Sequence, residues 1–157
     1  MSALPERSRI VQEHLTEAGI DTEIRVLPDS ARTAQEAASA IGCDVSAIAN
    51  SLVFLADGEP VLVLTSGGHR VDVTALGRRL GAEDVRMAPA SVVRAATGQA
   101  IGVVAPVGHP APLRTYIDDA LARYDEIWAA AGHPHTVMPL TFETLRRLTG
   151  GEVVSVV

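Results

Sequence analysis

The chain has 157 residues, of which 47% are hydrophobic and 20% are charged, and its 13 Lys and Arg against 19 Asp and Glu give a net charge of −6. This length predicts a single domain, residues 1–157, and the hydrophobic content excludes intrinsic disorder. The 3% aromatic content argues against a base-stacking platform and the negative charge against a general phosphate-binding surface, so we expect any contact with nucleic acid to be local.

Apolar periodicity and capping residues predict the first elements of the chain. Leu4–Ala18 carries a helical stripe of apolar residues, and Asp21–Leu27 alternates polar and apolar residues as a half-buried strand does. Thr33 and Glu36 have the spacing of a capping box, and the Ala-rich helix that they begin ends at Gly42.

A β-hairpin is predicted next. Two β-rich segments, Ile48–Ala56 and Pro60–Thr65, are joined at Asp57-Gly58, which is a strong signal for a tight turn. These segments hold the densest β-branched and aliphatic runs of the chain, so we expect the pair at the centre of a sheet.

The second half of the chain alternates short helices and strands. Glycine and proline interrupt the apolar residues of Thr97–Pro110 too often for a regular element. The other predicted elements are, in order, a helix at Val73–Leu80 ended by Gly81, a strand at Asp84–Met87, a helix opened by Pro89 and running through Ala96, strands at Arg114–Ile117, Glu126–Ala130 and Thr136–Leu140, a helix from Thr141 to Leu148, and a strand at Glu152–Val156. Together these elements predict an α+β fold with several antiparallel connections.

The candidate nucleophiles and carboxylate pairs receive little support from their neighbours. Cys43 precedes Asp44, whose negative charge raises a thiol pKa, whereas reactive thiols need electropositive surroundings. Ser51 and Ser66 lie outside a G-x-S-x-G elbow. Asp118-Asp119 is interpreted as a solvated or capping pair, because adjacent residues of a strand point to opposite faces.

The expected compartment follows from cysteine usage and hydropathy. One cysteine forms no internal disulfide, which fits a reducing cytoplasm. No stretch approaches the roughly 20 apolar residues that cross a bilayer, so we expect neither a membrane anchor nor an export signal.

Five histidines, His14, His69, His109, His133 and His135, are the remaining titratable candidates. The spacing of His133-Pro134-His135 can bind zinc on an extended strand, but no pattern supplies further ligands, so no metal and no other cofactor is predicted. Three of the histidines follow glycine in accessible loops, where function concentrates, although a solvated loop histidine is an equally good interpretation of each.

Two glycine-rich segments offer backbone rather than side-chain chemistry. Thr65–His69 and Gly102–Pro106 both lack the spacing of a phosphate loop. Glycine and proline nevertheless expose backbone N–H groups in a fixed curve, which can bind a carbonyl oxygen and stabilise an oxyanion.

Several segments in a fixed order carry a family resemblance. They are the Thr-capped helix, Ile48–Phe54, Thr65–Asp72, the loop from Thr97 to Pro106 with its G-x-x-x-P motif, and Gly132–Thr136. Covering nearly the whole chain, they resemble the YbaK/EbsC family of trans-editing aminoacyl-tRNA deacylases, which are related to the insertion domain of bacterial prolyl-tRNA synthetase. The resemblance implies a mixed, barrel-like β-sheet flanked by helices, and hydrolysis of the ester in a mischarged tRNA.

The resemblance also implies a site and its partners. The catalytic residues would be Asn50, Gly102, Val103, Val104, Ala105 and Pro106. The substrate-binding residues would be Thr33, Ser51, Ser66, Gly67, Gly68, His69, Gly98, His109 and His133. The implied partner is the 3′ aminoacyl end of a mischarged tRNA, with an aminoacyl-tRNA synthetase as a second candidate.

One position departs from the family pattern. Members of established activity usually carry a lysine where this chain has Asn50, and asparagine keeps a hydrogen-bonding group but loses the cation. An aminoacyl ester is already activated towards a water or the neighbouring ribose hydroxyl, so positioning and an oxyanion site suffice. Two hypotheses compete with the deacylase: a catalytically silent module that binds an aminoacyl or nucleotide ligand, and a metal-dependent hydrolase that uses His133 and His135.

Overall fold

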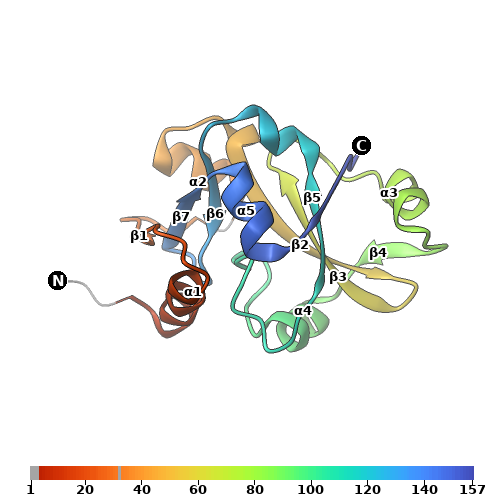
Figure 1. Ribbon diagram of the computed structural model, residues 1–157, viewed down its shortest axis with the longest axis horizontal. Helices are drawn as coiled ribbons and strands as arrows, with labels where there is room; N and C mark the ends of the chain where they lie inside the picture. Colours follow the sequence, from red (N-terminus) through yellow and green to blue (C-terminus); the bar gives the residue numbers. More distant parts are fainter. Residues whose placement is uncertain (1–3, 32) are drawn as a thin grey trace.

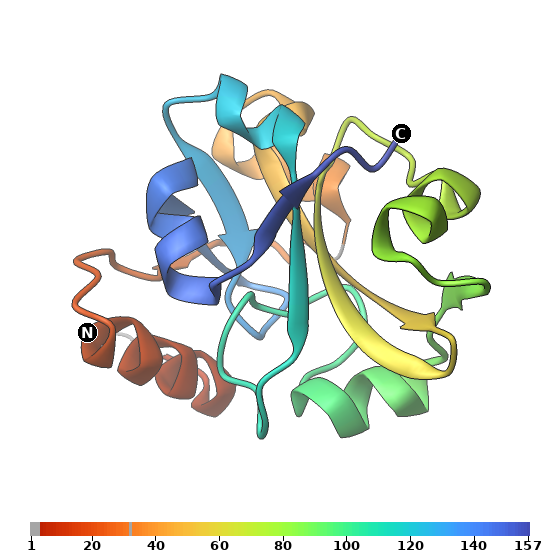
Figure 2. The ribbon, with the colours of Figure 1, turned by 45° about the vertical axis from the view of Figure 1, so that its right-hand side comes forward.

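The computed structural model describes residues 4–31 and 33–157, which form one mixed β-sheet with helices packed around it (Figure 1). The strand order is β1-β7-β6-β2-β3-β5-β8, and β4 pairs with β2 off this path. The predicted α+β class is confirmed. Figure 2 shows the long hairpin of β2 and β3 curving through the middle of the molecule.

The central hairpin forms as its turn sequence predicts. Strands β2 (Ile48–Ala56) and β3 (Glu59–Ser66) are antiparallel neighbours in the middle of the sheet. Asp57 and Gly58 have φ values of 51° and 87°, the left-handed conformation that a type I′ turn requires. The remaining strands are β1 (Arg25–Val26), β4 (Val85–Met87), β5 (Arg114–Asp118), β6 (Ile127–Ala130), β7 (Thr136–Leu140) and β8 (Glu152–Val154).

One edge of β2 is only partly covered. Strand β6 runs parallel to it at Ile48 and Ala49, and β4 runs antiparallel to it from Phe54 to Ala56. In the part of the chain that the structure describes, no strand pairs with this edge of β2 at residues 50–53. We call this opening the sheet break, and it starts at Asn50.

Thr33 and Thr141 accept N–H bonds at helix starts, as predicted, and Asp72 does the same at a third helix. The first helix has its C-cap at Ala18 rather than at the predicted Gly19. Pro89 lies at the N-cap rather than inside the first turn, a shift of one residue from the prediction. The α-helices are α1 (Glu6–Glu17), α2 (Ala34–Ile41), α3 (Val73–Leu80), α4 (Ala90–Thr97) and α5 (Phe142–Thr149), and the 3-10 helices are η1 (Val45–Ala47) and η2 (Asp119–Arg123).

The core is aliphatic, as the scarcity of aromatic residues predicts. Its largest cluster joins α1, α5 and the central strands. A smaller cluster packs the alanines of α2, Ala37 and Ala38, against Ile48, Trp128 and Val137. Because alanine has a short side chain, α2 lies close to the sheet beside the break. No helix formed by the described residues has the length and apolar character needed to cross a membrane.

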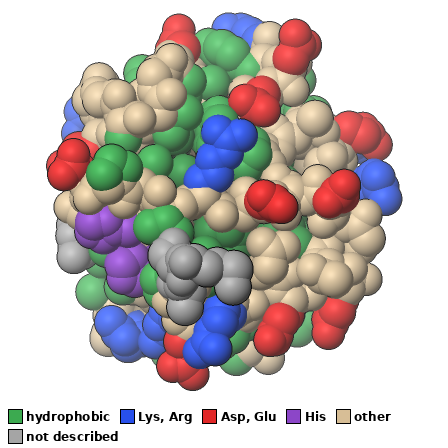
Figure 3. Space-filling model, turned by 90° about the vertical axis from the view of Figure 1, so that its left-hand side faces the viewer, with side chains coloured by type: hydrophobic (Ala, Val, Ile, Leu, Met, Phe, Trp, Pro, Cys, Tyr) green, Lys and Arg blue, Asp and Glu red, His purple; other side chains and the backbone are tan. Residues whose placement is uncertain are grey.

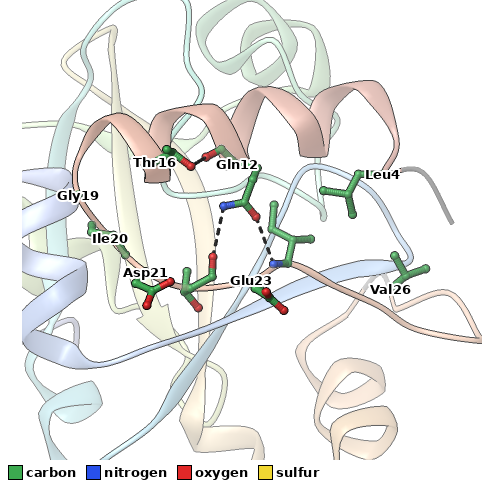
Figure 4. Close-up of a pocket in the computed structure, with 10 residues that line it drawn as sticks. Leu4, Gln12, Thr16, Gly19, Ile20, Asp21, Glu23 and Val26 are labelled. Atoms are coloured by element: carbon green, nitrogen blue, oxygen red, sulfur yellow. Dashed lines mark hydrogen bonds between the residues drawn. The ribbon is translucent and has the colours of Figure 1, made fainter. Parts of the chain in front are cut away.

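The prediction for Asp21–Leu27 is wrong in extent. Only Arg25 and Val26 pair with β7, and Val26 is exposed although the alternation placed it inward. Figure 4 shows the reason: the Gln12 side chain reaches from α1 and bonds the backbone at Thr22 and Ile24, at 3.2 and 3.4 Å. Farther along β7, Pro139 has no backbone N–H that could donate to a neighbouring strand. A side chain of the preceding helix therefore replaces the expected strand pairing.

Candidate active site

A small, mostly apolar pocket opens at the sheet break, between α2, β2, β6 and the loop that follows α4. Its volume of about 30 Å³ is on the scale of one or two water molecules. The pocket brings together five of the predicted site residues from three segments that are distant in sequence. Its lining consists of Ala31, Thr33, Ala34, Ala37, Ile48, Ala49, Asn50, Ser51, Gly102, Val104, Trp128, Ala129, Ala130 and Val137.

The backbone of the G-x-x-x-P loop alternates between satisfied and free N–H groups. Val103 N–H donates within the turn at 3.2 Å, and Ala105 N–H donates to Gln99 Oε1 at 2.7 Å. Gly102 and Val104 N–H have no acceptor among the described residues, and both of these residues line the pocket. Gly102 has a φ of 89°, which favours glycine. The loop thus offers two backbone donors at the pocket wall.

Gln99 holds this loop in shape, and the sequence reasoning missed it. Its side chain is 3% exposed; Oε1 accepts from Ala105 N–H, and Nε2 donates to Val107 O at 3.0 Å. The amide therefore satisfies one donor and one acceptor of a segment without regular structure. The only indication of this role in the sequence is that Gln99 is a single polar residue between Gly98 and an apolar loop.

His109 fixes the same loop from its other side. Its Nε2–H donates to Ala105 O at 2.9 Å, so both backbone groups of Ala105 are bound by side chains. Burial lowers the pKa of His109, and nearby His14 lowers it further, while the bond to Ala105 O acts in the opposite direction. His109 and Pro106 line a separate hollow of about 410 Å³ rather than the pocket.

Asn50 and Thr33 differ in how free their side chains are. The Asn50 amide forms no hydrogen bond with any described residue, although the residue is only half-exposed and lines the pocket. Thr33 Oγ1 is occupied as the cap of α2, because it accepts Glu36 N–H at 3.1 Å. Asn50 is therefore the amide side chain available to a ligand in this pocket.

Ser51 carries a polar atom without a partner. Its residue is 7% exposed, and its hydroxyl oxygen is buried without a hydrogen bond to any described residue. Buried hydroxyls are normally bonded, and an exception needs a specific explanation. The position of Ser51 in the pocket lining makes a ligand group the natural partner.

The Ser66–His69 turn lies behind the pocket wall rather than in its lining. A Cβ atom on Gly67 would stand 2.8 Å from Ala34 Cβ and 3.3 Å from Ile48 Cβ, two lining residues. Gly68 is equally crowded by the Ser46 hydroxyl. Because these two glycines have no side chain, the turn packs closely behind the pocket wall. The turn therefore supports the wall and does not itself line the pocket.

Asp118 anchors this turn, and its interpretation as a solvated group is wrong. Its side chain is fully buried and accepts from Ser66 N–H at 2.9 Å, Thr65 Oγ1 at 3.3 Å and Ala120 N–H at 3.0 Å. His69 Nδ1 lies 2.8 Å from Oδ2, and a carboxylate only accepts, so the imidazole donates. The capping part of the expectation is confirmed by the bond to Ala120.

The other predicted residues lie elsewhere. Gly98 ends α4 with a φ of 72°. His133 and His135 have ring centroids 5.6 Å apart, and Figure 3 shows histidine side chains gathered on the face of the molecule that carries β1. Within residues 4–31 and 33–157, no three His, Cys, Asp or Glu side chains group as metal ligands would.

Cys43 lacks the surroundings of a reactive thiol. Burial raises the pKa of the thiol, and the charge of Asp44 raises it further, as the sequence predicts for this neighbour. The thiolate fraction at neutral pH is therefore small.

A larger hollow of the described surface lies away from these residues. It measures about 810 Å³ and lies along α1 and the segment from Gly19 to Val26 (Figure 4). None of the predicted site residues lines it. The side-chain amide of Gln12, which lines it, already forms hydrogen bonds with the backbone of Thr22 and Ile24.

Comparisons with known proteins identify the family of this chain. The aminoacyl-tRNA editing domain family matches residues 28–148. YwhH of Bacillus subtilis (strain 168) is 27% identical over 143 residues, which are 91% of each protein. The proline–tRNA ligase of Nitratidesulfovibrio vulgaris (strain DP4) is 29% identical over 116 residues, which are 74% of this chain but only 20% of the ligase. The crystal structure of a candidate trans-editing enzyme for prolyl tRNA synthetase superposes with a TM-score of 0.92 and 41% identity, over 98% of both chains.

Proposed function

Because this chain belongs to the aminoacyl-tRNA editing domain family and is an aminoacyl-tRNA deacylase, we propose that it acts in trans on mischarged tRNA and releases a small amino acid. The observation that carries this proposal is that the N–H groups of Gly102 and Val104, at a small apolar pocket, have no acceptor within residues 4–31 and 33–157. The similarity to a proline–tRNA ligase and to a candidate trans-editing enzyme for prolyl tRNA synthetase makes tRNA mischarged by that synthetase the first substrate to test, and the synthetase a candidate partner.

The proposed reaction needs positioning rather than a nucleophilic side chain. A water molecule attacks the ester carbonyl carbon, and the carbonyl oxygen becomes an oxyanion that accepts hydrogen bonds from Gly102 and Val104 N–H. The bond from that carbon to the ribose oxygen then breaks, and the ribose oxygen takes up the proton that the water loses. The products are the free amino acid and a tRNA with its terminal hydroxyl restored.

The pocket walls favour a small amino acid. Ala34, Ala37 and Ala49 line the pocket beside Val104, and the whole space is about 30 Å³. One additional methylene in an apolar pocket changes binding by about 1–3 kcal/mol, or roughly 10- to 200-fold. Alanine-sized side chains are therefore expected to react much faster than valine-sized ones.

A deacylation panel tests the proposal directly. We expect the protein to hydrolyse alanyl ester on proline tRNA faster than valyl ester, and to keep its rate in EDTA, because no complete ligand set is present among the described residues. Binding of the charged tRNA without turnover would instead identify a silent module. Loss of activity in EDTA, restored by zinc, would support the metal-dependent alternative at His133 and His135.

Asn50 is expected to contribute modestly to this activity. The Asn50→Ala substitution removes a free amide from the pocket, and a hydrogen bond to an uncharged group is worth about 0.5–1.5 kcal/mol, so kcat/KM should fall about 2- to 12-fold. Asn50→Lys should strengthen binding of the anionic tRNA end, with a gain that shrinks as salt is raised. Steady-state kinetics at two salt concentrations measure both effects. An Asn50→Ala variant with unchanged kcat/KM would remove Asn50 from the site.

A further inference from the structure

The backbone of Ser51 faces the sheet break rather than strand β3. Gly67 N–H donates to Ile48 O, and Ala88 N–H donates to Val53 O. In an antiparallel pair, successive residues turn their backbone groups to opposite edges of the strand. The backbone of Ser51 therefore turns the same way as that of Val53, away from β3 and into the sheet break.

Ser51, which lines the pocket, carries two hydrogen-bond acceptors. One is its carbonyl oxygen, at the stretch of β2 that neither β6 nor β4 covers, and the other is its buried, unpartnered hydroxyl. The donors of Gly102 and Val104 belong to the same pocket. Beside the Asn50 amide, the pocket therefore offers two donors, from Gly102 and Val104, and two acceptors, from Ser51, within mostly apolar walls.

An aminoacyl ester carries the complementary groups on adjacent atoms. Its carbonyl oxygen accepts hydrogen bonds, and the α-ammonium one carbon away donates three. A hydroxyl on the substrate side chain would satisfy the Ser51 hydroxyl but leave the Ser51 carbonyl facing the break. The ammonium satisfies both acceptors, and leaving buried polar groups unpaired is unfavourable.

We infer that Ser51 binds the α-ammonium group of the aminoacyl ester through its carbonyl and hydroxyl oxygens, while the Gly102 and Val104 N–H groups hold the ester carbonyl. This inference rests on the proposed function and narrows its substrate class. Esters with a free α-amino group are substrates. Esters whose nitrogen is acylated, as at the end of a peptidyl-tRNA, are rejected, because acylation removes the charge and adds bulk in a pocket of about 30 Å³.

Two non-hydrolysable probes test the inference independently of turnover. They are adenosine carrying alanine in amide linkage at its 3′ position, and the N-acetyl derivative of the same compound. Calorimetric titration of the wild type should give at least 10-fold tighter binding of the free-amine probe. This preference should weaken at pH values above the pKa of the probe's amine, which is about 8.

The Ser51→Ala variant distinguishes recognition from a structural role. It should bind the free-amine probe about 10-fold more weakly and the N-acetyl probe unchanged, because hydrogen bonds to charged groups are the stronger ones. Its melting temperature should equal or exceed that of the wild type, since the substitution removes an unpaired buried hydroxyl.

Each possible outcome decides one of the two proposals. Equal binding of both probes by the wild type, failure to bind either, or an equal loss of both in Ser51→Ala would overturn the role of Ser51. Discrimination between the probes without hydrolysis of any charged tRNA would contradict the deacylase proposal alone. Hydrolysis of alanyl-tRNA and N-acetyl-alanyl-tRNA at equal rates would contradict the Ser51 inference alone.

Discussion

Replacing Gly102 by valine is expected to lower kcat/KM for deacylation by about 100- to 1000-fold, the usual effect of losing an oxyanion donor. Gly102 has a φ of 89°, a conformation that a β-branched residue adopts only with strain of about 1–3 kcal/mol. The loop must therefore shift, and its free N–H groups move with it. Gly102 also lines the pocket, whose volume is about 30 Å³, so a shift of the loop changes the pocket itself.

The matched control for this variant is Gly81→Val. Gly81 also has a positive φ, of 72°, at the end of α3, and a Cβ atom there would meet nothing within 4 Å. It lies outside the pocket lining, so the variant should lose stability but keep its activity per folded molecule. Single-turnover assays at matched folded concentrations compare the two. If Gly102→Val hydrolyses the ester as fast as Gly81→Val, the oxyanion-loop mechanism is wrong.

Local signals predicted most of the secondary structure because the physics that forms these elements is local. Thr33 and Thr141 cap helices through bonds to residues three positions away. The Asp57-Gly58 turn fixes the register of its hairpin by backbone conformation alone. Where a side chain of another element intervenes, as Gln12 does beside Ile24, the local pattern fails.

The candidate site was only partly predictable for the same reason. The family resemblance names Asn50, Ser51 and Gly102, and the structure brings these residues to one pocket. It does not bring His109 or His133 to that pocket. Whether a loop histidine faces a pocket or the back of a loop depends on the packing of segments far apart in sequence, which periodicity does not encode.

The supporting residues were missed because their roles are defined by distant partners. In the sequence Gln99 is one polar residue in a loop. In the structure its amide is hydrogen-bonded to Ala105 N–H and Val107 O, on either side of Pro106. The sheet break is also invisible in sequence. Residues 50–53 continue the β-rich pattern of β2, and only the pairing of β6 and β4 shows where the edge is open.

Replacing Asp118 by alanine is expected to cause the largest loss of stability, about 3–5 kcal/mol, because it removes a buried carboxylate that accepts several hydrogen bonds, each worth about 1.5–3 kcal/mol. The carboxylate is fully buried and accepts from Ser66 N–H, Ala120 N–H and His69 Nδ1. Alanine leaves these donors without an acceptor inside the protein. Asp118→Asn should lose less, because one amide oxygen still accepts while the amide nitrogen opposes the remaining donors.

The neighbouring residue provides the control for this prediction. Asp119 is exposed in the first turn of η2, so Asp119→Ala should change the unfolding free energy by no more than about 0.5 kcal/mol. Urea unfolding measures both variants, and an unchanged slope with denaturant would show that only stability has changed. Asp118→Ala should also raise KM, because the turn that it anchors places Gly67 against Ala34 and Ile48 of the pocket wall. Equal midpoints for the Asp118 and Asp119 variants would contradict the anchoring role of Asp118.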